Sequence, residues 1–481
     1  MATISSAGIG SGLDVNSIIT QLIALERRPI NQLQTQKTGL TTQLSSYGRI
    51  QSSLDTLRTA ARSLTESSTW TPTTATSSDT SAVGASTGTS TSPGSYSVQV
   101  TRLAASQLIA TSALPSASST LGQGTLHIEL GAWDAGATAF TPKSGGSVID
   151  IAIGAGQDTL EGIRDQINGN TSVGVRASIV TDNSGARLVL TSASSGETNG
   201  FRLTVTDADA VDNDNAGLSR LAYDPAGGAG VATRTQAALD ASALINGLTV
   251  LSSSNTLSNV IDGVTLTLAK ITVSPVEISI NRDSAAMRKS VETFASAYND
   301  VIKLLRDQTK YDPATKTGGP LQGDRAAVGL EDRLRTLLRQ DSSASSVFVR
   351  ASDIGLDVQT DGSIKTNTAK LDAAIVNVAE IKKFFTTSGG SDASDGLGIR
   401  SRNLTDSILG IEGPVATRKQ GLQKRIDSNV SRQEAYEQRV LATEARLRAQ
   451  YTALDRNMAQ LSGLQGYVTQ QVANWNRSSS N

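Results

Sequence analysis

The sequence predicts an α+β multidomain protein, in which terminal coiled-coil helices form a leg next to an α-helical domain with inserted β-rich head domains. Three observations support this fold class. Apolar residues recur with heptad spacing near both chain ends, the apolar period changes to two from about Ser95, and the helical period returns from Ser284. The β-rich segment is therefore inserted between two helical arms.

The amino end is predicted to form two consecutive helices. Asp14 is a suitable N-cap for a helix over Val15–Arg28, and a second helix then runs to about Thr65. The Gly- and Ser-rich residues 1–13 are expected to form a flexible arm. Residues 71–95 are rich in Ser and Thr, which favours an extended linker or an edge-strand region.

The middle of the chain alternates apolar and polar residues, as half-buried strands do. A short helix is expected over Leu160–Ile167, a hairpin around Asp182–Gly185, and an acidic loop over residues 207–235. The expected strands cover residues 96–100, 126–130, 148–153, 173–180, 187–191, 201–206, 248–251, 264–268 and 276–280.

From Ser284 onward, apolar residues again lie on one helical face. Further helices are expected over Leu330–Leu338 and Leu371–Phe385, a small hairpin over residues 354–364, and helix from about Asn403 nearly to the end. The predicted domains are a terminal coiled-coil leg (1–45 and 440–481), a helical domain (46–75 and 284–439), a β-rich domain (76–100 and 236–283) and an outer variable β-rich domain (101–235).

Both chain ends carry an apolar stripe of the kind that packs helices along one line. The predicted coiled-coil and assembly interface consists of Leu33, Leu40, Tyr47 and Leu54, together with Leu447, Tyr451, Leu454, Met458, Leu461, Val468, Val472 and Trp475. Two interpretations stay open: the stripes pair within one chain as a stem, or they also join neighbouring subunits. Polar residues interrupt the pattern at Glu437, Glu444 and Gln465, so an isolated helix pair should be marginal and could fold on assembly.

Composition excludes several classes of protein. The 481 residues include 43 Lys+Arg and 44 Asp+Glu, a balance that argues against a nucleic-acid binder. The absence of cysteine excludes a thiolate nucleophile, and a single histidine disfavours zinc or histidine-based catalysis. No apolar run is long enough to span a membrane, and no cleaved secretory signal is expected at the start. Residues 76–283 carry 10 basic and 18 acidic side chains, so the insert should be an acidic, outward-facing region.

Two glycine- or aspartate-rich segments could bind ligands, but each fits a simpler role. Gly8–Gly12 lacks the third glycine of a dinucleotide loop, where Leu13 stands, and no strand precedes it. The acidic residues within Asp207–Asp214 could begin a calcium loop, but Ala216 and Tyr223 stand where two ligands are needed. A flexible arm and a solvated acidic loop are the expected structures.

Two sets of ionisable residues are candidates for acid–base chemistry. His127 lies in an alternating strand without a neighbouring Ser or Asp motif, which favours an ordinary sheet residue. Asp324 and Glu331 could form a carboxylate pair, but on helices of this composition such residues usually face solvent. The sequence therefore predicts no enzyme, no catalytic residues, no cofactor and no metal.

Seven segments match, in order, the motifs of one family. They are Gly8–Asp14, Pro93–Val100, Ile245–Val250 (similar to a flagellin-type repeat), Asn255–Leu268, Leu321–Asp324, Ile354–Ile364 and Tyr451–Trp475. Through these segments the chain resembles the bacterial flagellar filament cap protein family, also called flagellar hook-associated protein 2, over essentially its whole length. The least similar part is about residues 101–235.

The resemblance implies a structural cap at the distal tip of the flagellar filament, which promotes flagellin polymerisation, prevents loss of unpolymerised flagellin and so supports motility. It implies a ring-shaped homo-oligomer that contacts flagellin, with the hook-filament junction protein and a cytoplasmic export chaperone as further partners. It also implies secretion through the flagellar type III apparatus to the extracellular filament tip. Two alternatives stay open: a surface adhesin that binds a host surface ligand, and another hook-associated junction protein.

Overall fold

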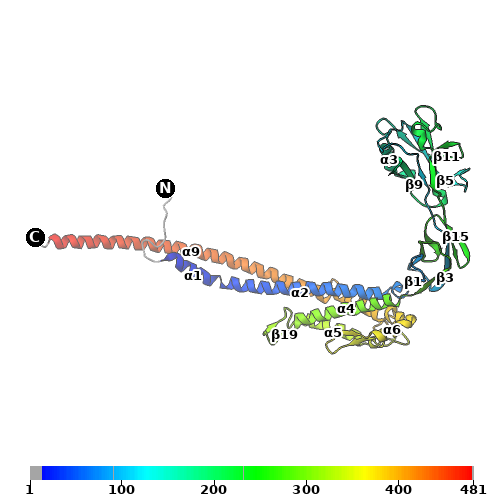
Figure 1. Ribbon diagram of the computed structural model, residues 1–481. Helices are drawn as coiled ribbons and strands as arrows, with labels where there is room; N and C mark the ends of the chain where they lie inside the picture. Colours follow the sequence, from blue (N-terminus) through cyan, green and yellow to red (C-terminus); the bar gives the residue numbers. More distant parts are fainter. Residues whose placement is uncertain (1–13, 90, 231, 479–481) are drawn as a thin grey trace. The chain divides into compact units, whose positions relative to one another are not determined.

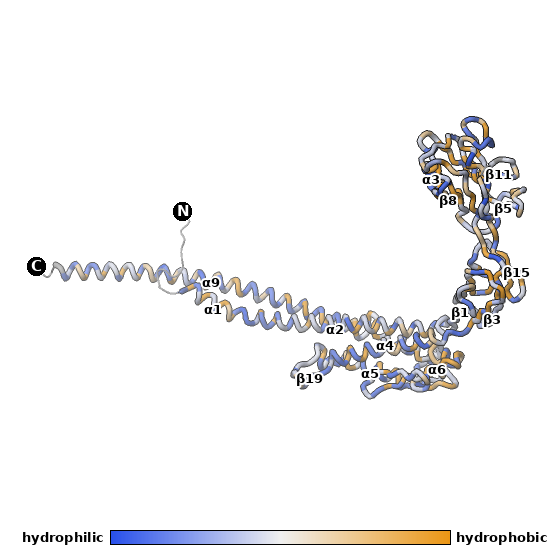
Figure 2. Tube along the Cα trace, viewed as in Figure 1, coloured by the Kyte–Doolittle hydropathy of each residue, from blue (hydrophilic) through white to orange (hydrophobic). Residues whose placement is uncertain are grey.

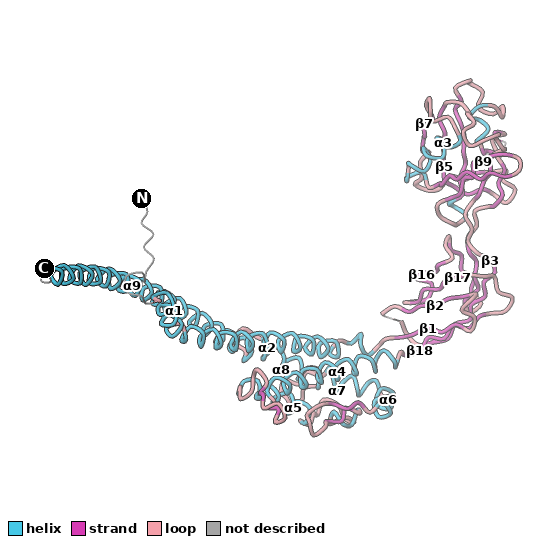
Figure 3. The backbone as a smooth tube through the Cα atoms, turned by 60° about the vertical axis from the view of Figure 1, so that its left-hand side comes forward, coloured by secondary structure: helices cyan, strands magenta, loops and turns pink. Residues whose placement is uncertain are grey.

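The computed structural model describes residues 14–89, 91–230 and 232–478, which form two compact units (Figure 1). The first unit joins Met1–Trp70 to Ser284–Asn481, and the second is Thr71–Asp283. Figure 3 shows that the first is mainly helical and that the second is mainly built of strands. The predicted α+β multidomain class is confirmed. The second unit begins at Thr71, ahead of the predicted boundary at residue 75, because the first strand of its sheet already starts at Thr73.

The helical unit contains eight α-helices among the described residues. They are α1 (Val15–Glu26), α2 (Arg28–Thr65), α4 (Ser284–Thr309), α5 (Arg325–Arg339), α6 (Thr368–Val376), α7 (Val378–Thr386), α8 (Leu397–Leu409) and α9 (Pro414–Ser478). Two short antiparallel pairs accompany them, β19 (Tyr311–Asp312) with β20 (Thr317–Gly318) and β21 (Leu356–Val358) with β22 (Ile364–Thr366). Short 3₁₀ helices lie at Ser67–Trp70 and Ala351–Ile354 in this unit, and at Thr171–Val173, Glu197–Asn199 and Gly217–Leu221 in the second unit.

Local sequence signals set several helix ends. The carboxylate of Asp14 accepts a hydrogen bond from the Ser17 amide at 3.0 Å, as expected of the predicted N-cap. The predicted single helix over Leu371–Phe385 is wrong, because Asn377 leaves the helical conformation (φ −93°, ψ 66°) and separates α6 from α7. The predicted final helix is likewise divided, because residues 410–413 separate α8 from α9.

The largest apolar core lies among the helices of this unit. The long helix α2 packs against α4, α8 and α9, and its buried face carries most of the amino-terminal stripe. At one end of this core, the Trp70 ring stacks on Phe385 with centroids 5.2 Å apart, and Trp70 Nε1 donates to the Leu64 carbonyl at 3.0 Å. α2 is therefore the central helix of this unit.

The second unit has an inner pair of sheets that enclose one apolar core. The five-stranded sheet has the antiparallel order β1-β18-β3-β14-β15 and the three-stranded sheet the order β16-β17-β2. Their strands are β1 (Thr73–Ser77), β2 (Val83–Thr87), β3 (Gly94–Arg102), β14 (Ala241–Ile245), β15 (Leu248–Ser252), β16 (Thr256–Ile261), β17 (Val264–Leu268) and β18 (Val276–Arg282).

An outer group of strands and one helix encloses a separate core in the same unit. One sheet has the order β12-β11-β10-β5-β6 with β7 also paired to β5, and the other has the order β13-β4-β9-β8. The elements are β4 (Leu108–Ala110), β5 (Gly124–Trp133), β6 (Phe140–Pro142), β7 (Ile149–Ile153), α3 (Leu160–Gly169), β8 (Val175–Asp182), β9 (Gly185–Ser192), β10 (Gly200–Asp207), β11 (Tyr223–Asp224), β12 (Ala229–Gly230) and β13 (Thr233–Gln236).

The predicted hairpin around Asp182–Gly185 is confirmed, since β8 and β9 pair antiparallel with Asp182 opposite Gly185. The strands that sequence patterns missed are β4, β6, β11, β12, β13, β14 and β16 in this unit and β19 and β20 in the helical unit. β1 and β2 are edge strands within residues 71–95, the segment predicted as an extended linker or an edge-strand region. Most of the missed strands have five residues or fewer, too few for a period of two to stand out. Residues 207–235 are therefore not loop throughout.

Candidate functional site in the helical stem

A buried carboxylate joins three helices of the helical unit. Asp324 caps the start of α5, where its Oδ1 accepts hydrogen bonds from the amides of Ala326 at 3.0 Å and Ala327 at 3.4 Å. The same carboxylate accepts from the Tyr47 hydroxyl of α2 at 2.9 Å and from Arg418 Nε of α9 at 2.9 Å. Only 8 % of Asp324 is exposed, so this group of contacts, here called the Asp324 junction, is enclosed by the fold.

The Asp324 junction is a structural contact and not an acid–base pair. Burial alone would raise the pKa of Asp324, but the hydrogen bonds from Tyr47 and Arg418 outweigh burial and hold that pKa below its usual value of 3.8. Burial, and then the bond to the carboxylate, raise the pKa of the Tyr47 phenol. The expected solvent-facing pair is wrong, because Asp324 is buried and Glu331 instead pairs with Arg335 at 2.8 Å.

Away from this junction, α1 packs against α9 in a small apolar cluster, which we call the stem cluster. Its buried members are Val15, Ile19, Ile23 and Val440, and Ile30, Leu447 and Tyr451 pack half-buried against them. Four buried side chains are few for a pair of helices, and the polar residues beside them add little. We therefore expect the stem cluster to open more easily than the core around α2.

Beyond Tyr451, α9 continues to Ser478 for about 40 Å at the usual helical rise. Tyr451 is the last residue of α9 in a hydrophobic cluster of the described residues. Leu454, Met458, Leu461, Leu464, Val468 and Val472, which we call the exposed stripe, are 43, 38, 61, 62, 51 and 48 % exposed. Figure 2 shows hydrophobic residues alternating with hydrophilic ones along this end of α9.

The predicted interface residues fall into three groups. Leu33, Leu40, Tyr47 and Leu54 are buried within their own chain, Leu447 and Tyr451 are half-buried against α1, and Leu454, Met458, Leu461, Val468, Val472 and Trp475 are exposed. The first group offers almost no surface to another subunit. The third group is exposed, and Leu464 between its members is exposed as well.

The polar interruptions of the heptad pattern have separate surroundings. Glu437 lies 3.9 Å from Arg27, next to the stem cluster, and Glu444 pairs with Arg448 at 2.8 Å on α9 itself. Ion pairs as exposed as these contribute little to stability. Gln465 is exposed at the heptad position between Leu461 and Val468, where it interrupts the exposed stripe.

Two glycines weaken the exposed end of α9, and replacing them should stabilise it. Nothing lies within 4 Å of a Cβ built at Gly463 or Gly466. Changing each to Ala should therefore favour the helix by about 1 kcal/mol. In far-UV circular dichroism of the full chain, the double variant should keep more helix on mild heating. Gly421→Ala, in the packed part of α9 and equally open, is the control and should leave this early loss of helix unchanged. If Gly421→Ala preserved as much helix on mild heating as the double variant does, the exposed end of α9 would not melt separately from the rest of the helix.

His127 takes part in a line of hydrogen bonds across three strands. Its Nδ1 lies 2.7 Å from Asp150 on β7, and its Nε2 lies 3.0 Å from the Thr206 hydroxyl on β10. Sequence reasoning missed these partners because they stand far from residue 127 in the chain. Asp150 has a 64 % exposed side chain, so the line lies on the outside of the sheet and links neighbouring strands.

The acidic segment at 207–214 is tied to its own backbone. Asp207 accepts from the Ser219 amide at 2.9 Å, and Asp214 accepts from the Ala216 amide at 2.9 Å. Asp212 accepts from the Asp207 amide at 2.8 Å. Among the described residues, no group of three or more His, Cys, Asp or Glu is placed to hold a metal ion. The Gly8–Gly12 segment lies outside the described residues.

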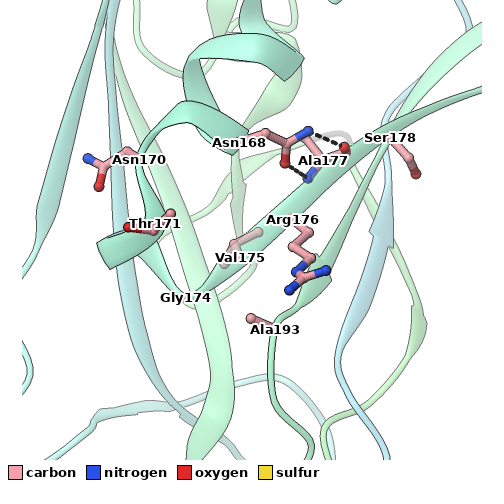
Figure 4. A pocket seen from close by; sticks show the side chains of 9 residues that line it. All are labelled: Asn168, Asn170, Thr171, Gly174, Val175, Arg176, Ala177, Ser178 and Ala193. Atoms are coloured by element: carbon pink, nitrogen blue, oxygen red, sulfur yellow. Dashed lines mark hydrogen bonds between the residues drawn. The ribbon is translucent and has the colours of Figure 1, made fainter. Parts of the chain in front are cut away.

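A hollow of about 490 Å³ lies beside α3 and β8 (Figure 4). Its lining residues are Asn168, Asn170, Thr171, Gly174, Val175, Arg176, Ala177, Ser178 and Ala193. The Asn168 side chain donates to the Ala177 carbonyl at 2.8 Å and accepts from the Ala177 amide at 2.9 Å, so it is already satisfied. Arg176 is the only charged lining residue, and the hollow offers no acid–base group for catalysis.

None of the described helices combines the length and the apolar character that a membrane crossing requires.

The chain matches two parts of one family, described as flagellar hook-associated protein 2 N-terminus over residues 11–107 and C-terminus over residues 238–463. It also matches the flagellin hook IN motif over residues 139–194. That motif lies outside Ile245–Val250, the segment in which the sequence suggested a flagellin-type repeat.

Proteins of similar sequence match the chain from end to end. The B-type flagellar hook-associated protein 2 of Pseudomonas aeruginosa is 31 % identical, over 97 % of this chain and 97 % of its own length. The flagellar hook-associated protein 2 of Escherichia coli K12 is 31 % identical, over 98 % and 99 %. The crystal structure of the D1-D2-D3 domains of the flagellar cap protein FliD from Escherichia coli has a TM-score of 0.61 and 27 % identity, covering 79 % of this chain and 99 % of that one.

Proposed function

The chain belongs to the flagellar hook-associated protein 2 family, and we propose that the exposed end of α9 is the part with which it holds the filament. It is a structural cap protein of the bacterial flagellar filament and not an enzyme. In this role it promotes flagellin polymerisation and prevents the loss of unpolymerised flagellin. No similarity found supports the alternative of a surface adhesin.

The exposed stripe is the observation that carries the proposed mechanism. A cap must hold the filament end and still yield when each new flagellin subunit enters. An isolated helix with half-exposed apolar residues, two glycines and a polar interruption at Gln465 forms only weak contacts with a partner helix. Each contact is therefore broken and remade at low cost, whereas a continuous apolar seam would hold the cap in place.

The finer features of the role follow from the same proposal. The predicted leg at 1–45 and 440–481 engages the filament end, and the helical domain and the two β-rich domains at 76–100 with 236–283 and at 101–235 remain outside it. Several copies form a ring that contacts flagellin. The chain is exported by the flagellar type III apparatus with a cytoplasmic chaperone, and it meets the hook-filament junction protein before the filament grows.

Imaging of labelled filaments tests this role. The chain has no cysteine, so Val376→Cys, at a side chain that is 85 % exposed, provides one site for a maleimide dye. Live cells that carry this variant should show one spot at the free end of each filament. Spots at the filament base would indicate a junction protein, and dye on host cells without filaments would indicate an adhesin. Either result would contradict the cap.

A further inference from the structure

Strand β15 forms an open edge of the inner five-stranded sheet. It pairs with β14 on one side and is the last strand of that sheet on the other. Residues 241–261, which include β15, contain no charged residue and no proline. Edge strands in soluble proteins are usually protected from pairing by charges, proline or a bulge. An uncharged, regular edge therefore suggests that a partner strand covers it.

The turn before β15 determines which backbone groups face this edge. Asn246 (φ 50°) and Gly247 (φ 83°) form a two-residue turn, and Ile245 lies opposite Leu248. The Asn246 amide donates to the Ser97 carbonyl of β3 at 2.9 Å, so the even-numbered residues of β14 face β3. By the alternation of an antiparallel pair, the backbone groups of Thr249 and Leu251 then point away from β14.

Three of the five side chains of β15 are apolar, and two of these three are poorly covered. Leu248 is 73 % exposed and Leu251 is 61 % exposed. Val250 lies on the core side of the sheet, opposite Ala243, and packs half-buried against the inner core. The core face of the sheet thus continues to its open edge, where a further strand could extend it.

Three other edges of this unit, at β16, β8 and β13, are protected. β16 is also uncharged, but its pairing with β17 is irregular around Asn259, which has a φ of 68°. β8 carries Arg176 and Asp182, and β13 carries Arg234. Such bulges and charges are the usual devices against edge-to-edge pairing. β15 has neither.

We propose that β15 pairs antiparallel with β15 of a second copy of this chain, across a two-fold axis at Val250. In this register Thr249 lies opposite Leu251 of the partner subunit, and Leu251 lies opposite Thr249 of the partner subunit. Both outward-facing residues of each strand then find hydrogen-bonding partners. Two copies of this edge can thus satisfy each other's outward-facing backbone groups, and no like charges oppose each other because the strand is uncharged. An isologous interface requires such self-complementarity.

This contact adds one surface to the proposed assembly, and it rests on the proposed function only in assuming that several copies assemble. A two-fold contact cannot close a ring of copies by itself, so it joins subunits in pairs or joins two rings. If the β15 contact proved not to form, the proposed cap role would be unaffected. That role is tested separately, by the position of the dye on filaments.

Single cysteines in the full chain test the register. Val250 would face its own copy across the axis as a non-hydrogen-bonded pair, with Cα atoms about 4.5 Å apart, within the range of a disulfide. Val250→Cys should therefore form a dimer under oxidising conditions, seen on a non-reducing gel. Leu251→Cys should cross-link at least tenfold less. In this register the two cysteines are not opposite each other but lie two residues apart along the paired strands. Thr249→Cys combined with Leu251→Cys should restore the dimer.

Proline at the outward-facing position provides an independent test. Leu251→Pro removes an amide that faces away from β14, so it should keep the pairing within the chain and block the added strand. The sedimentation coefficient should fall to that of a smaller species, with an unchanged melting temperature. Val273→Lys, at a 97 % exposed residue of the same unit, is the control and should leave the assembly unchanged. Equal cross-linking by Val250→Cys and Val273→Cys, or an assembly unaffected by Leu251→Pro, would overturn the proposal.

Discussion

A chain that ends at Tyr451 is expected to fold normally and to lose its capping activity. The removed part of α9 belongs to no hydrophobic cluster of the described residues, so the free energy of unfolding should change by less than about 0.5 kcal/mol. A strain that carries only the shortened chain should have short or absent filaments and should release flagellin into the medium. Filament length by microscopy and flagellin in the medium by immunoblot measure both effects.

Substitutions within the full chain distinguish the effect of the exposed stripe from the effect of shortening α9. Leu461→Gln with Val468→Gln removes two members of the exposed stripe, and filament growth should fall severalfold. Ala459→Gln with Asn474→Gln places the same side chain on the opposite face of α9 and should leave growth unchanged. The amount of each variant in the medium shows whether export is intact. Full capping by the chain that ends at Tyr451 would exclude the proposed role of the stripe.

Asp324→Asn is expected to destabilise the helical unit by about 3 kcal/mol, the largest loss we expect from a single substitution. The change removes the negative charge between Tyr47 and Arg418 while it keeps the size of the side chain. Tyr47→Phe removes only one of the hydrogen bonds and should cost about 1 kcal/mol. Urea unfolding followed by circular dichroism at the helical wavelength measures both changes.

Acid should reduce this difference, since the pKa of Asp324 lies below its usual value of 3.8. A carboxylate of this kind contributes stability above its unfolded pKa and loses that contribution as pH falls through the folded pKa. The gap in stability between the natural chain and Asp324→Asn should thus be full at pH 7 and should shrink below about pH 4. A gap that stays constant down to pH 2 would show that Asp324 acts through packing and not through charge.

Local sequence signals predicted the ends of several elements well. The N-cap at Asp14, the end of α2 at Thr65 and the hairpin between β8 and β9 all depend on neighbouring residues. The prediction of element ends failed where neighbouring residues in the sequence carry no clear signal. The break at Asn377 interrupts an otherwise apolar helical pattern, and β11 and β12 have two residues each.

The candidate site was predicted in part, for a related reason. Heptad spacing identifies an apolar helical face, but it does not say what covers that face. Tyr47 and Leu461 look alike in such a pattern, yet Tyr47 is fully buried in its own chain and Leu461 is 61 % exposed. Leu464, one position before the interruption at Gln465, was missed because it lies outside the strict heptad.

The sequence by itself determined the order of the helical and β-rich parts and the family, because periodicity and motifs are properties of neighbouring residues. Only the tertiary structure decided which apolar residues are core and which are exposed. It also brought Asp324 to Tyr47 and Arg418, which lie 277 and 94 residues away along the chain. Contacts between such distant residues depend on how the helices pack, and no local pattern encodes that packing.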